Sequence, residues 1–146
     1  MFKIKHFNEL TANDMYEIAK SRYEVFACEQ QIFCENDFDN LDKNCYHIFL
    51  EEEDKVISYA RIIPKKFSSY GEASIGRVLV LSDFRNNGIA KKMILTSIEF
   101  IQNILNESHI ILSSQEYIKD LYISCGFKEI SDPYIEANIP HIKMKL

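Results

Sequence analysis

The sequence predicts an α+β domain in α/β/α layers, with helices covering both faces of a central, mixed but mostly antiparallel sheet. Two observations predict it. Short apolar or alternating runs typical of strands recur along the chain, and two longer segments carry apolar residues at helical spacing. The second half also repeats a strand–loop–helix order. At 146 residues, the chain is expected to fold as a single domain spanning residues 1–146.

The N-terminal part is expected to hold a strand, a helix and a loop, in that order. Residues 2–5 alternate apolar and basic side chains, as a strand with one exposed face does. Thr11-Ala12-Asn13-Asp14 has the form of a capping box, and helical apolar spacing continues from there to Phe26. Residues 35–44 are acidic and lack that spacing, so they predict a loop.

The middle of the chain predicts three strands. Two apolar runs, residues 46–52 and 56–63, flank Glu53-Asp54-Lys55 and indicate a hairpin. A loop over residues 64–71 begins with a proline and ends with a glycine. Residues 73–80 are apolar enough to form another strand.

The second half predicts two helices and three strands. Apolar residues at helical spacing indicate a helix over residues 89–105. A strand at 109–113 and a short helix at 115–125 follow. The chain is expected to finish with strands at 127–130 and 139–146.

The composition argues against several classes of protein. A net charge of −5 and a pI near 5.4 disfavour a nucleic-acid partner, because such domains are usually basic. No apolar run approaches the ~18 residues of a membrane span, so we expect no membrane partner and a cytoplasmic protein. We also expect no metal. Cys28, Cys34, Cys45 and His47 match no usual zinc spacing, and residues 37–48 lack the glycine and glutamate of a calcium loop.

The sharpest motif is Arg85-Asn86-Asn87-Gly88-Ile89-Ala90, which leads directly into a predicted helix. Average usage would give about ten glycines, and the chain has four, so each is expected where positive φ or close backbone approach requires it. A glycine turn that aims helix N-terminal N–H groups at one point makes an anion site. Arg85, Lys91 and Lys92 add positive charge, but the ATP and NAD motifs are missing. A helix start with solvated lysines would give the same pattern.

Tyr122 is expected on the apolar face of its helix, because Ile118, Leu121 and Cys125 share its helical spacing. One interpretation is a core tyrosine whose hydroxyl finds a backbone partner. The other is a general acid beside a leaving group, since a phenol with an ordinary pKa near 10 stays protonated at neutral pH.

Arg22 and Glu29 lie on the apolar stripe of the first helix, too far apart to pair across a rise of about 10 Å. Because buried charges need partners or water, each either bridges to the sheet or a loop or lines a substrate cleft. Asp37 belongs to an acidic loop that is either solvated or forms a rim attracting a cationic amine. His141 either bonds to a loop or acts as a base in the cleft.

Together these features resemble the GNAT acyltransferase superfamily, and in particular its ElaA-like branch. Arg85-x-x-Gly88-x-Ala90 matches the acyl-CoA motif of the superfamily, and residues 122–127 match its later aromatic-x-x-x-Gly-Phe element. Three departures stand out: Asn86 in place of a glycine, Ala137-Asn138 in place of Asp-Gly, and no Pro-Tyr after Gln30. The features shared with the branch span nearly the whole chain: Arg22, Val25-Phe26, Glu29-Gln30, Asp37, Asp39, His47, Ala60-Arg61, Gly76-Arg77-Val78, Ser114-Gln115, Glu136 and Ile139-Pro140-His141-Ile142.

The resemblance implies the GNAT acyltransferase fold, whose twisted sheet is splayed between two neighbouring parallel strands, here residues 73–80 and 109–113. It also implies acetyl-CoA, as a co-substrate, in the resulting cleft. The pantetheine arm would lie on the backbone of Val78, Leu79 and Val80, with Tyr122 beside the thioester. The residues implied for the diphosphate are Arg85, Asn86, Asn87, Gly88, Ile89, Ala90 and Lys91.

The implied activity is transfer of an acetyl group to a primary amine by direct attack in a ternary complex. Tyr122 would be the general acid, and the base would be Glu29, Glu136, His141 or a bound water. The acceptor amine would be a small molecule or a peptide, and a homodimer is compatible with the sequence. The residues implied for the acceptor are Arg22, Glu29, Asp37, Arg77, Gln115, Glu136 and His141.

Other functions fit the same resemblance. A non-catalytic acyl-CoA-binding or sensing module would keep the donor site and release no thiol. A protein-interaction domain would keep the fold alone, which the retention of Gly88, Gly126 and Tyr122 disfavours. Acyl-homoserine-lactone synthases resemble the start of the chain, but the complete motif of residues 85–90 disfavours them.

Overall fold

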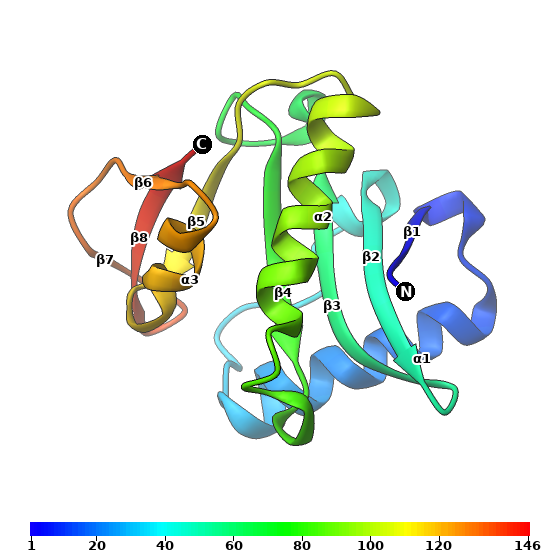
Figure 1. Ribbon diagram of the computed structural model, residues 1–146. Coiled ribbons are helices and arrows are strands. Elements are labelled where there is room, and N and C mark those ends of the chain that lie inside the picture. Colours follow the sequence, from blue (N-terminus) through cyan, green and yellow to red (C-terminus); the bar gives the residue numbers. More distant parts are fainter.

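The central layer begins with a four-stranded antiparallel sheet in the order β1-β2-β3-β4 (Figure 1). The computed structural model describes all 146 residues. Glu53 and Asp54 join β2 to β3 with φ of 51° and 61°, as a two-residue turn between twisted strands requires. The predicted hairpin is therefore confirmed. The strands are β1 (Lys3–His6), β2 (Tyr46–Glu52), β3 (Lys55–Ile63) and β4 (Ser74–Val80).

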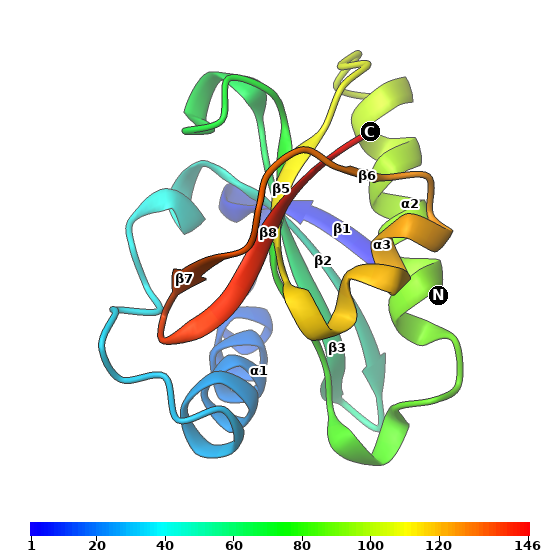
Figure 2. The same ribbon diagram turned by 90° about the vertical axis from the view of Figure 1, so that its left-hand side faces the viewer.

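A second antiparallel sheet is built around the C-terminal strand β8 (Ile139–Lys145), which pairs with three others. On one side lies β5 (Ile111–Gln115), and on the other lie two short strands, β6 (Lys128–Glu129) and β7 (Tyr134–Glu136). Figure 2 shows this sheet in front, with the four-stranded sheet behind it.

The two sheets meet between β4 and β5. Ala73 and Ile110 form a parallel bridge, and the Ile111 N–H donates to the Ala73 carbonyl oxygen at 3.0 Å. From there the strands separate, and Figure 1 shows β5 leaning away from β4. The expected mixed, mostly antiparallel sheet, splayed between two parallel strands, is therefore confirmed.

Helices cover both faces of the four-stranded sheet. Helix α1 (Ala12–Arg22) begins at the predicted capping box and continues as a π-helix over Tyr23–Glu29. Helix α2 (Ile89–Asn103) covers the other face, and the short α3 (Lys119–Ser124) packs beside α2 and β5. The predicted α/β/α layers are thus present.

The alternation of β3 divides the core between the two helices. Ile57 and Tyr59 pack with the side chains of α1, whereas Ala60 and Ile62 pack with those of α2. The α2 side forms the larger core, which continues under β5 and β8.

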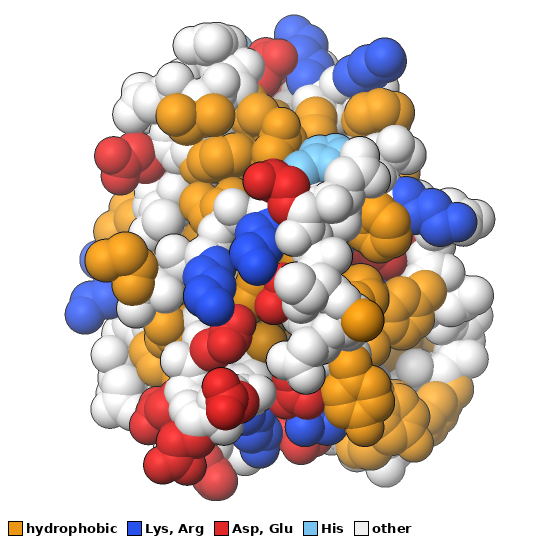
Figure 3. Space-filling view, turned by 90° about the vertical axis from the view of Figure 1, so that its right-hand side faces the viewer, with side chains coloured by type: hydrophobic (Ala, Val, Ile, Leu, Met, Phe, Trp, Pro, Cys, Tyr) orange, Lys and Arg blue, Asp and Glu red, His pale blue; other side chains and the backbone are white.

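The face of the molecule on which β1 lies carries both basic and acidic side chains (Figure 3). Figure 3 shows the side on which β1 lies, where Lys and Arg side chains are scattered among acidic and apolar ones. None of the helices combines the length and the apolar character needed to cross a bilayer.

One strand was absent from the sequence prediction. Strand β7 is joined to β8 by Ala137 and Asn138, whose φ values are 52° and 61°. This two-residue hairpin usually takes Asn-Gly or Asp-Gly, and an alanine in the left-handed region hides the turn. The predicted helix over 115–125 also begins as a 3₁₀ turn (Glu116–Ile118).

Arg22, the last residue of α1, is fully buried and anchors the loop of residues 31–45. Its Nε lies 2.8 Å from Asp37 Oδ2, and its Nη1 lies 2.8 Å from Asp42 Oδ1. Burial opposes its charge, but contacts with Tyr59, Asp42 and Asp37 outweigh burial and raise the pKa of Arg22. For Arg22, the predicted bridge to a loop is confirmed.

Two arginines of the sheet bind the same loop. Arg61 of β3 contacts both oxygens of Asp39, at 2.7 and 2.8 Å, and lies 3.2 Å from Asp42 Oδ1. Arg77 of β4 lies 2.7 Å from Asp37 Oδ1. Each carboxylate is balanced by a guanidinium. The interpretation of Asp37 as part of a negatively charged rim is therefore corrected.

We expect Arg22→Met to lower the free energy of unfolding by about 1.5–3 kcal/mol, because it removes charged hydrogen bonds to Asp37 and Asp42 and leaves each carboxylate with only one arginine. The matched control is Lys3→Met, which removes an exposed ion pair to Glu51 and should cost at most about 1 kcal/mol. Urea unfolding at neutral pH measures both. Equal losses in the two variants would show that the buried network does not hold the loop.

Acid should weaken the same network. Burial alone would raise the pKa of Asp39, but hydrogen bonds and charge from Arg61 outweigh it and lower the pKa to about 2. The ordinary value is about 3.9, so this stabilisation is complete above pH 4 and is lost as the pH falls towards 2. Asp39→Asn should therefore flatten the fall in unfolding free energy between pH 4 and 2.5. The exposed control Asp132→Asn should not, and parallel curves for parent and Asp39→Asn would contradict the assignment.

Candidate functional site

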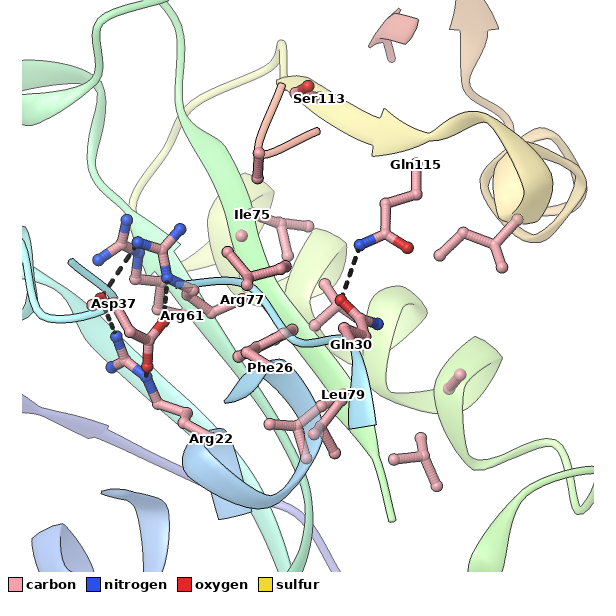
Figure 4. Close-up of a pocket in the computed structure, with 18 of the residues that line it drawn as sticks. Arg22, Phe26, Gln30, Asp37, Arg61, Ile75, Arg77, Leu79, Ser113 and Gln115 are labelled. Atoms are coloured by element: carbon pink, nitrogen blue, oxygen red, sulfur yellow. Dashed lines mark hydrogen bonds and ion pairs between the residues drawn. The ribbon is translucent and has the colours of Figure 1, made fainter. Parts of the chain in front are cut away.

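A cleft of about 630 Å³ follows the line along which β4 and β5 separate (Figure 4). The end of the first helix and the loop after it form one wall, and β4 with the start of α2 forms the floor. Residues of β5, α3 and β8 form the opposite wall. The cleft brings together every residue that the sequence assigned to catalysis or to the acceptor, and nearly all of those assigned to the donor.

A β-bulge in β4 shapes the floor of the cleft. Tyr59 pairs with Leu79 and Arg61 pairs with Gly76, so two residues of β4 lie opposite one residue of β3. Arg77, in the bulge, has a φ of 52°. A bulge leaves backbone groups without ladder partners and bends its strand. Backbone polar groups around Arg77 and Val78 are therefore available to a ligand in the cleft.

The start of α2 lies at one end of the cleft. Its N-cap is Gly88, at a φ of 76°, and no side chain caps the helix. The first-turn N–H groups of Ile89, Ala90 and Lys91 therefore have no partner within the helix. No acidic side chain lies in that turn. These are the properties of an anion site.

Arg85 and Glu29, two predicted site residues, contact each other at the mouth of the cleft. Arg85 Nη2 lies 2.6 Å from Glu29 Oε1, and Arg85 Nε donates to the Val80 carbonyl oxygen at 2.8 Å. Asn87 donates to the Phe84 carbonyl oxygen at 3.3 Å, which tightens the turn before Gly88. The carboxylate of Glu29 is thus engaged by a guanidinium.

Tyr122 has features of both interpretations made from the sequence. It is buried, packs edge-to-face on Phe127 with 5.9 Å between ring centroids, and also lines the cleft. Burial raises the pKa of its hydroxyl, and the nearby Cys125 and Tyr117 groups add to the effect. The hydroxyl therefore stays protonated at neutral pH.

Gln115, His141 and Glu136 lie on the second sheet, across the cleft from α1. Gln115 and His141 are direct cross-strand partners, so their side chains share one face. His141 Nε2 lies 3.6 Å from Glu136 Oε2. Gln115 Nε2 donates to Gln30 Oε1 at 3.0 Å, which bridges the cleft from β5 to the end of the first helix, as Figure 4 shows.

Sequence reasoning missed two groups that shape the site. The contact between Gln30 and Gln115 joins residues 85 positions apart, and no local pattern indicates such a pair. Asp42 was considered only as a calcium-loop residue, yet it lies within 3.2 Å of both Arg22 and Arg61. The position of Arg22 on the apolar stripe of its helix was the available signal, because a buried guanidinium requires a carboxylate partner.

Comparisons with known proteins agree with this geometry. A family model described as "Acetyltransferase (GNAT) domain" matches residues 19–146. A UPF0039 protein of Schizosaccharomyces pombe is 39% identical over 147 residues, covering 99% of this chain and 95% of its own. Protein ElaA of Escherichia coli is 29% identical over 95% of this chain and 91% of its own.

Solved structures show the same fold. The crystal structure of Escherichia coli ElaA has a TM-score of 0.90 at 27% identity, and an acyl-CoA N-acyltransferase from Pseudomonas aeruginosa has 0.90 at 26%. Both comparisons cover 99% of this chain and 98% of the other. A CoA-dependent acyl-homoserine lactone synthase, at 13% identity and a TM-score of 0.83, shares the fold alone. From the matching domain, the ElaA relatives and the splayed sheet, we conclude that the chain belongs to the GNAT acetyltransferase family, in its ElaA-like branch.

Proposed function

We propose that the protein transfers an acetyl group from acetyl-CoA to a primary amine by direct attack within a ternary complex. One observation carries the proposal. The uncapped start of α2, entered through Gly88 at a φ of 76°, opens into the cleft that separates β4 from β5. An anion site joined to a narrow cleft suits a ligand with a diphosphate at one end and an extended arm.

The donor would be held mainly by main-chain groups. The amides of Gly88 to Lys91 and the side chain of Arg85 would bind the diphosphate, and the backbone of Val78 to Val80 would hold the pantetheine arm. The residues present fit this role. A Cβ built on Gly88 would have no heavy atom within 4 Å, so the space in front of these amides is open. The guanidinium of Arg85 would either leave the Glu29 carboxylate to bind the phosphate oxygens, or donate to both groups at once.

The chemistry needs little beyond positioning of the reactants and proton transfers. The amine nitrogen bonds to the thioester carbonyl carbon as the carbon–sulfur bond breaks. The bound ammonium first gives one proton to His141, which frees the nitrogen lone pair for this attack. Sulfur takes the phenolic proton of Tyr122, and the nitrogen then gives its remaining excess proton to solvent. Exchange with solvent returns a proton to Tyr122 and removes one from His141. Holding the two reactants together can supply about 7–11 kcal/mol, and one well-aimed N–H on the oxyanion about 2.7–4 kcal/mol.

His141 is better placed than Glu29 to take the proton of the acceptor. Glu29 Oε1 is engaged by Arg85 Nη2 at 2.6 Å, at the mouth of the cleft. His141 lies on the acceptor side, and its Nδ1 is 2.6 Å from the Ile139 carbonyl oxygen. A carbonyl oxygen only accepts, so Nδ1 carries the proton and the lone pair of the neutral ring is on Nε2.

We expect Tyr122→Phe to lower the turnover number by about 10²–10⁴-fold, the usual contribution of a general acid, while the affinity for acetyl-CoA stays within a factor of about three of the parent. Thiol release measures the first quantity and calorimetry the second. Tyr16→Phe, on the exposed face of α1, is the matched control and should leave both unchanged. Equal turnover in parent and Tyr122→Phe would remove Tyr122 from the mechanism.

Gly88→Val should abolish coenzyme A binding by placing a branched side chain in front of the helix amides. Gly71→Val is a close control, because Gly71 has a φ of 78° and equally open surroundings. Both variants should lose a similar free energy of unfolding, about 1–3 kcal/mol of backbone strain. Calorimetry should show lost affinity in Gly88→Val alone, and unchanged affinity in that folded variant would reject the anion site.

Two assays of the parent protein distinguish the remaining candidate functions. Coenzyme A should raise its melting temperature, and acetyl-CoA with an amine should release thiol. A thermal shift without thiol release from any amine, amino acid or peptide would indicate a binding or sensing module. If coenzyme A gave no thermal shift and acetyl-CoA released no thiol, both the donor site and the enzymatic activity would be rejected.

A further inference from the structure

We propose that the acceptor is a primary alkylamine with no carboxylate beside its amino group, bound as its ammonium ion by three hydrogen-bond acceptors. These are Gln115 Oε1, His141 Nε2 and the Glu136 carboxylate. This assignment rests on the proposed function of the same cleft and specifies the substrate class that the cleft takes.

The three acceptors come from adjacent strands and point to one face. Gln115 pairs with His141, and Glu136 pairs with Ile139, which lies two residues before His141 on β8. Residues two apart on a strand, and direct partners on neighbouring strands, share a face of the sheet. All three side chains line the cleft.

Gln115 presents an acceptor that nothing in the protein satisfies. Its Nε2 donates to Gln30 Oε1 at 3.0 Å, which fixes the orientation of the amide group. Its Oε1 is buried and has no hydrogen-bond partner. A buried carbonyl oxygen without a donor is costly, so the site is incomplete until a donor occupies it.

His141 and Glu136 present two more acceptors side by side. His141 is 6% exposed, and its Nδ1 is committed to the Ile139 carbonyl oxygen at 2.6 Å. The lone pair on Nε2 then faces Glu136 Oε2 at 3.6 Å, beyond hydrogen-bond distance. Two acceptors at this separation repel each other unless they share a donor, and an ammonium group supplies one N–H to each.

The number and the charge of these groups select the ligand. An alkylammonium ion has three N–H donors, whereas a hydroxyl has one. The nearby guanidiniums of Arg22, Arg61 and Arg77 are already paired with aspartates, so they do not offset the charge of Glu136. The Lys143 ammonium on β8 lies 5.7 Å from the centroid of the Tyr70 ring. Lys143 does not line the cleft, so a carboxylate beside the amine would meet Glu136 without a lysine on this wall to offset the repulsion.

Matched amine pairs test the assignment. The parent protein is assayed for thiol release from acetyl-CoA with n-butylamine against norvaline, and with tyramine against tyrosine. The amine without a carboxylate should have at least about tenfold higher kcat/KM in each pair, the effect of one like-charge contact near a protein surface. Equal or higher kcat/KM for the amino acid, or thiol release with none of these amines while coenzyme A still binds, would overturn the assignment.

Substitutions test whether the preference for amines without a carboxylate depends on Glu136. Glu136→Gln should raise the KM for n-butylamine and reduce its advantage over norvaline to about threefold or less, while coenzyme A affinity stays unchanged. Glu99→Gln, on the exposed surface of α2, makes the same charge change and should leave the preference intact. A preference unchanged in Glu136→Gln would overturn the assignment.

Gln115 gives a second, independent test. Gln115→Leu removes the acceptor and should raise the KM for the amine, whereas Gln115→Glu keeps an acceptor and should retain amine binding. Equal KM values in the parent and in a folded Gln115→Leu variant would remove Gln115 from the site. Failure of coenzyme A to bind the parent would instead reject the proposed function, so the two failures are distinguishable.

Discussion

The separation of β4 from β5 is the constraint on which the rest of the structure depends. The two parallel neighbours bridge at Ala73 and Ile110 and then diverge, which exposes strand edges inside the domain. Unpaired edges must be covered or used. The opening between the two strands is surrounded by the bulge at Arg77, the start of α2 and the end of the first helix. The cleft therefore lies where the strands of the sheet separate.

The distribution of charge gives the cleft two different ends. Three arginines and three aspartates neutralise one another beside it, and Arg85 is paired with Glu29 at its mouth. What remains is the helix start with Lys91 at one end and Glu136 with His141 at the other. The network of paired charges therefore fixes the loop of residues 31–45 without imposing a net charge on either end.

Much of the fold could be predicted because its signals are local. Alternation identified β1, and apolar runs identified β2, β3 and β4. The capping box at Thr11 identified α1, and Gly88 marked the start of α2. The partners of Arg22 could not be predicted, because they depend on the path of a loop with no periodicity. Strand β7 was missed because Ala137 occupies a turn position that normally takes Asn or Asp. The roles of the site residues remain proposals.

The Glu29 carboxylate, which contacts Arg85, competes with dissolved anions for the Arg85 guanidinium. The carboxylate is tethered to the chain, so its effective concentration at the guanidinium is high. A singly anchored anion such as chloride or acetate gains little by displacing it. A ligand that also reaches the uncapped amides of α2 gains several contacts for the one it breaks, so the pair discriminates in favour of polydentate ligands.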